Sequence, residues 1–61
     1  MKPETEISLA RALIHRHGVQ AAAVAQEHVQ QSQAQNDQEG AVGWAGVARA
    51  INQLRQESRA A

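Results

Sequence analysis

Apolar residues recur at steps of three and four along three stretches of this chain, which is the spacing of an amphipathic helix. The last stretch has the cleanest apolar face, formed by Trp44, Val47, Ala48, Ile51 and Leu54. The first carries Ile7, Ala10, Leu13, Ile14 and His17 on one face. The middle stretch offers a narrower face of Val19, Ala22, either Ala25 or Gln26, and Val29, with Val24, His28 and Gln31 nearly opposite. The pattern predicts an all-α protein, a three-helix bundle with helices over about residues 3–17, 19–35 and 38–58.

Residues with strong local preferences mark the expected helix ends. Pro3 suits the first turn of a helix, and Gly18 suits the position just after a helix C-terminus, where a left-handed conformation is common. Asn36, three residues before Glu39, has the spacing of a capping box at the start of the third helix, and Asp37 is a competing N-cap. We therefore expect breaks near Gly18 and near residues 36–37.

The size of the chain limits the core that it can form. Its 61 residues make one small domain at most, over residues 1–61, and 13 of the apolar residues are alanine. It has no cysteine, so neither disulfides nor thiolate metal sites can compensate for a small core. We therefore expect a homodimer that completes the fold through a contact along Leu13, Val47, Ile51 and Leu54.

Two groups of residues are candidates for close packing. The larger side chains expected in the core or in the dimer interface are Leu13, Ile14, Trp44, Val47, Ile51 and Leu54. Trp44 is the sole aromatic residue, and it is expected either to anchor the core or to be a partner hot spot. Glycine inside a helix is costly, so Gly43 and Gly46, with Ala50, are expected to form a ridge that lets another helix approach closely.

Charge and reactive groups exclude several classes of function. Six basic and six acidic residues cancel, which gives no general attraction to nucleic acid or to anionic membranes. No signal peptide or membrane-spanning apolar run is present, so we expect a cytoplasmic protein. His15 and His17 lie two residues apart and point to different sides of a helix, and no other ligands complete a metal site. No catalytic set can be assembled, and we expect neither an enzyme nor a cofactor.

A DNA-binding helix-turn-helix is the alternative. Gly18 and Val24 match the glycine and a later apolar position of that motif, whereas Ile14 and Glu27 depart from it. The expected recognition helix also carries no arginine or lysine. The outer face of the third helix does carry groups able to contact phosphates and base edges: Arg49, Asn52, Gln53, Gln56 and Arg59.

Several segments resemble a family of short bacterial helical proteins of unknown function. The first is the run from Leu13 to Gly18, which ends in His-Gly and is followed by Ala21 and Ala25. The second starts at Asp37 and continues through Gly40, Trp44, Val47, Ala50-Ile51 and Leu54. The resemblance covers roughly residues 7–56, and the glutamine-rich middle departs from it. It implies a compact helical unit and transfers no activity or site residue.

These observations together favour a non-enzymatic protein–protein interaction module. Such a module would act as a small regulator or inhibitor of a larger macromolecular machine. The alternative is the DNA-binding regulator described above.

Overall fold

The computed structural model describes the backbone of residues 2–60 and the side chains of residues 2–57. Helix α1 spans Pro3–His17, a short 3₁₀ turn, η1, spans Gly18–Gln20, helix α2 spans Ala21–Ala34 and helix α3 spans Gln38–Ala60. The described residues contain no strand. The predicted all-α class is therefore confirmed.

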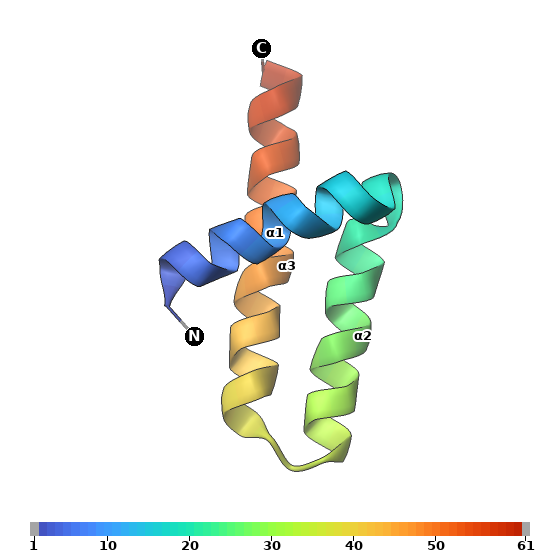
Figure 1. Ribbon diagram of the computed structural model, residues 1–61, viewed down its shortest axis with the longest axis vertical. Coiled ribbons are helices and arrows are strands. Elements are labelled where there is room, and N and C mark those ends of the chain that lie inside the picture. The colour runs from blue at the N-terminus through green and yellow to red at the C-terminus, as the bar shows by residue number, and fades with distance from the viewer. Residues whose placement is uncertain (1, 61) are drawn as a thin grey trace.

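Helices α2 and α3 form an antiparallel hairpin, and α1 lies across it (Figure 1). The chain leaves α1 through η1, turns sharply into α2, and returns through a short turn into α3. The C-terminal part of α3 extends beyond the level at which α1 crosses it. All three helices contact one another, but α3 makes the most extensive contacts with the other two, so it is the central element of the fold.

The core is small and consists mainly of alanine. The buried hydrophobic residues are Ala10, Ala21, Ala25, Val47, Ala48 and Ile51. Among the side chains that the structure describes, only Val47 and Ile51 are both large and fully buried. Ala10 comes from α1, and Ala21 and Ala25 come from α2. Since alanine has a short side chain, the backbones of α1 and α2 can approach the two larger side chains of α3 closely.

The corner between α1 and α2 depends on a glycine and is held by an arginine. Gly18 has φ 57° and ψ −123°, a backbone conformation that residues with a Cβ atom rarely adopt. Its N–H donates to the carbonyl of Ile14 and closes the last turn of α1. The Arg55 guanidinium of α3 donates to the Gly18 carbonyl over 2.8 Å. This bond ties the C-terminal half of α3 to the corner.

The turn between α2 and α3 combines a helix C-cap with an N-cap. Asn36 has a positive φ of 57°, and the N–H groups of Asn36 and Asp37 donate to the carbonyls of Gln33 and Ser32. This is the Schellman arrangement, with asparagine in the position often taken by glycine. Oδ1 of Asp37 then accepts the N–H of Gly40 over 3.0 Å. Of the two expected N-caps, the structure therefore selects Asp37.

Two residues expected on inward faces lie outside. Val19 is 89% exposed, because it belongs to the 3₁₀ turn at the corner and does not continue the face of α2. His17, at the last position of α1, is also exposed. Conversely, His28 was placed on the outer side of the middle helix, and it is half-buried. The prediction that Val19 lies on the inward face was wrong because it started the middle helix at residue 19, whereas α2 begins at Ala21.

Replacing the N-cap of α3 should weaken the fold. Asp37→Ala removes the side-chain acceptor for the Gly40 N–H, and we expect a loss of about 1 kcal/mol in the free energy of unfolding. Urea unfolding followed by circular dichroism measures it. Asp37→Ser retains a capping oxygen and serves as the control. Equal stability of Asp37→Ala and the unmodified chain would show that this cap contributes nothing.

Candidate functional site

An open groove lies where α1 meets the C-terminal half of α3. It is lined by Arg11, Ile14 and His15 of α1 and by Leu54 and Arg55 of α3. Leu54 and Ile14 are only partly buried although they pack against the core. We call this surface the α1–α3 groove.

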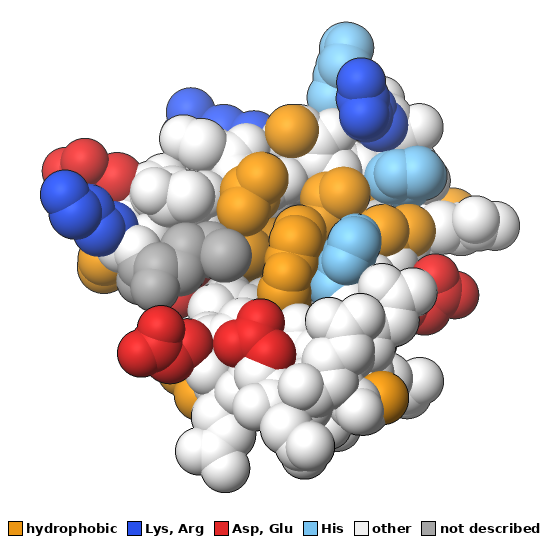
Figure 2. Space-filling view, turned by 60° about the horizontal axis from the view of Figure 1, so that its bottom comes forward, with side chains coloured by type: hydrophobic (Ala, Val, Ile, Leu, Met, Phe, Trp, Pro, Cys, Tyr) orange, Lys and Arg blue, Asp and Glu red, His pale blue; other side chains and the backbone are white. Residues whose placement is uncertain are grey.

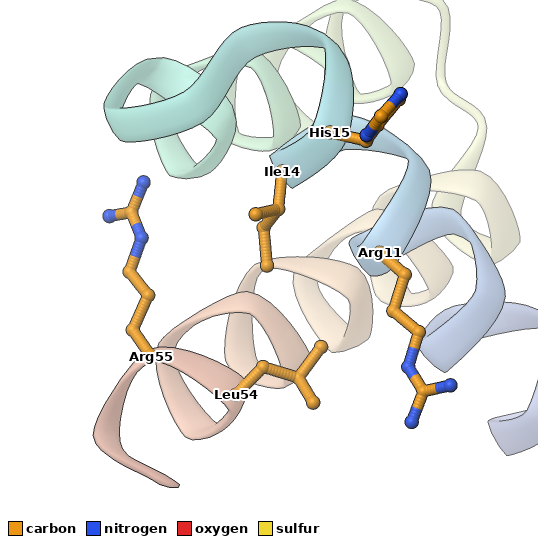
Figure 3. A pocket seen from close by; sticks show the side chains of 5 residues that line it. All are labelled: Arg11, Ile14, His15, Leu54 and Arg55. Atoms are coloured by element: carbon orange, nitrogen blue, oxygen red, sulfur yellow. The ribbon is translucent and has the colours of Figure 1, made fainter. Parts of the chain in front are cut away.

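The side chains of the α1–α3 groove form an apolar floor between two cations. Ile14 and Leu54 point toward one another from their two helices, and Arg11 and Arg55 lie on opposite sides of them (Figure 3). His15 points away from Leu54. Arg55 is held in place by its bond to the Gly18 carbonyl, whereas Arg11 is exposed. The arrangement suits an apolar group with a negative charge beside it.

A second hollow continues the groove along the same two helices. It shares Arg11 and Leu54 with the groove, and its other lining residues are Ile7, Ala50, Gln53 and Glu57. Ile7 is 43% exposed, which adds an apolar side chain to this surface. Hydrophobic side chains also gather in a band across the face shown in Figure 2, with histidine side chains beside them. The molecule therefore leaves apolar surface accessible after folding.

A third hollow lies at the turn between α2 and α3. Its lining residues are Gln33, Asn36, Asp37, Gln38, Ala41 and Val42. Val42 is 68% exposed. Glu39, in the first turn of α3, is exposed beside it. We call this end of the hairpin, residues 36–42, the acidic tip.

The small-residue ridge of α3 lies against other parts of the chain. Gly43 and Gly46 are buried and Ala50 is half-buried. A Cβ atom at position 46 would collide with the carboxylate of Glu6 from α1. The absence of a side chain at Gly46 thus makes room for the end of the flexible Glu6 side chain of α1.

Trp44 lies at the contact between α2 and α3. Its indole stacks on the imidazole of His28, with ring centroids 4.0 Å apart and planes inclined by 12°. Both side chains are half-buried. This pair is not predicted by the helical periodicity, which puts His28 on the outer face of the middle helix. Val24 and His28 are four residues apart and share a face of the helix, so the apolar Val24 was the signal in the sequence that this face is partly covered.

The other candidate residues fall into two environments. Val47 and Ile51 are fully buried, whereas Leu13, Ile14 and Leu54 are half-buried at the edge of the core. A dimer contact along the expected line would therefore find only Leu13 and Leu54 accessible. Of the proposed polar face, four residues are exposed: Arg49, Asn52, Gln53 and Gln56. The side chain of Arg59 lies outside the described residues.

Within the described part of the chain, no three histidine, aspartate or glutamate side chains come close enough to hold a metal ion. No helix among the described residues is both long and apolar enough to cross a membrane.

Comparisons of the chain with protein-family models, with curated proteins and with solved structures find no match. The resemblance to short bacterial helical proteins therefore stays a prediction.

Truncating Trp44 should destabilise the fold. Trp44→Ala removes both the indole that packs against the core and the stacking partner of His28. We expect a loss of about 3 kcal/mol in the free energy of unfolding, the lower end for aromatic residues because Trp44 is half-buried. Urea unfolding followed by circular dichroism measures it. His28→Ala removes the stack alone and should cost less. A Trp44→Ala variant as stable as the unmodified chain would exclude a core role.

Proposed function

We propose that this chain is a non-enzymatic protein–protein interaction module that forms a homodimer and acts as a small regulator or inhibitor of a larger macromolecular assembly. The second copy covers the α1–α3 groove. Dimerisation then completes a fold in which, within the described part of one copy, only two large side chains are fully buried, Val47 and Ile51.

The observation that carries the proposal is the partly exposed apolar floor of the groove. Ile14 and Leu54 both pack against the core, yet water reaches both. Covering such side chains on association is favourable by about 25 cal/mol for each Å² of apolar surface removed from water. Apolar surface bordered by charged groups is typical of interaction sites.

The oligomeric state tests this proposal. We expect sedimentation equilibrium to give a dimer at tens of micromolar, and the melting temperature to fall on hundredfold dilution, because folding is coupled to association. Leu54→Gln should shift the chain toward the monomer, since it places a polar group on the floor of the groove.

Val19→Gln is the matched control for Leu54→Gln. It removes a hydrophobic residue that is 89% exposed and lies outside the groove, so the dimer should be unchanged. A monomer mass at every concentration, with a melting temperature independent of dilution, would contradict the proposed dimer.

A DNA-binding regulator is the second candidate, favoured by the exposed polar face of α3. Arg49, Asn52 and Gln53 are all accessible to a nucleic acid. The exposed residues of α2, the recognition helix in a helix-turn-helix arrangement, include Glu27 and several glutamines but no arginine or lysine. Arginine and lysine supply most of the attraction to phosphates, so their absence from α2 favours the protein–protein module.

Binding to random duplex DNA at increasing salt separates the two candidates. For a protein–protein module, we expect no salt-dependent binding to the DNA, because the chain has no net charge to attract the phosphates. An association constant that falls steeply between low and moderate salt, and that Arg49→Gln weakens, would favour the DNA-binding regulator instead.

A further inference from the structure

Two surfaces, one near each end of α3, combine charged side chains of opposite sign with exposed apolar groups. At its N-terminal end, the acidic tip combines the exposed Val42 with the carboxylates of Asp37 and Glu39. Toward its C-terminal end, the α1–α3 groove combines the apolar floor with Arg11 and Arg55. One surface thus combines an exposed apolar side chain with two nearby carboxylates, and the other is an apolar hollow between two guanidinium groups.

A single copy cannot bring these two surfaces together. Glu39 and Leu54 lie on the same straight helix, separated by 15 residues, which corresponds to about 22 Å along its axis. The acidic tip of one copy can therefore reach a groove only in another copy.

We propose that the acidic tip of one copy docks in the α1–α3 groove of a second copy, with Val42 against Leu54 and Ile14, and Glu39 beside Arg11. This inference rests on the homodimer proposed above and names the surface that the second copy contributes. Opposite charges attract the acidic tip to the basic groove. Contacts of tip with tip, or of groove with groove, would bring like charges together, which is costly.

A two-fold arrangement contains this contact twice. The tip of each copy then occupies the groove of the other, as an isologous interface requires. A standard interface covers about 800 Å² on each partner, which is about one sixth of the 4592 Å² accessible on this chain. Each copy contributes both its tip and its groove to such a dimer, so the area buried on each partner is about twice that of a single contact.

Charge reversal on each surface, followed by mixing, tests the proposal. Arg11→Glu reverses the groove and Glu39→Arg reverses the tip. Each variant alone should dimerise at least about tenfold more weakly, because both of its contacts bring like charges together. In an equimolar mixture, each tip faces a groove of opposite charge, and a heterodimer should form with nearly the affinity of the unmodified chain. Native mass spectrometry distinguishes the heterodimer from both homodimers.

Matched controls change the same charges elsewhere. Arg49→Glu and Glu27→Arg reverse exposed residues outside both surfaces and should leave the dimer unchanged. The milder Arg11→Gln and Glu39→Gln variants, each checked for helicity, keep the test valid if a reversed variant fails to fold. Each should weaken the dimer less than its reversal.

The outcomes separate this inference from the proposed function. Weak homodimers that recover on mixing support the docking of the tip in the groove. An unmodified dimer that neither Arg11→Glu nor Glu39→Arg weakens would overturn the inference and leave the homodimer standing. Failure of the mixture to recover would also overturn it. An unmodified chain that is monomeric throughout would overturn both.

Discussion

The packing of α1 and α2 against a single apolar face of α3 is the constraint on which the rest of this structure depends. Val47 and Ile51 are the only large side chains of residues 2–57 that become fully buried, and alanines of the other two helices pack around them. Such a core is thin, so the side chains at its edge stay partly exposed. The groove at the edge of the core is therefore a direct consequence of how little this chain can bury.

Much of the fold follows from the sequence because its signals are local. The all-α class follows from helical periodicity, and the positive φ of Gly18 follows from the special conformation of glycine after a helix. Asn36 and Asp37 were both identified near the second break. Their separate roles, one ending α2 and the other capping α3, depend on backbone geometry that the spacing alone does not determine.

The surface features were harder to predict because they depend on how the helices cross. Leu54 and Ile14 were expected at a core or an interface, but their position opposite one another between Arg11 and Arg55 results from α1 lying across α3. The bond from Arg55 to the Gly18 carbonyl joins residues 37 apart in the chain. The stack of His28 on Trp44 likewise reflects the rotation of α2 about its axis, which an alanine-rich face specifies weakly.

Intermolecular paramagnetic relaxation tests the central claim, that a second copy covers the α1–α3 groove, most directly. The chain has no cysteine, so Gln38→Cys places a single spin label on the acidic tip. The labelled chain is mixed with an isotope-labelled chain that carries no spin label. The account predicts broadening of the amide signals around Ile14 and Leu54 in the second chain. Broadening confined to other surfaces, or no broadening at concentrations where dimers should form, would contradict it.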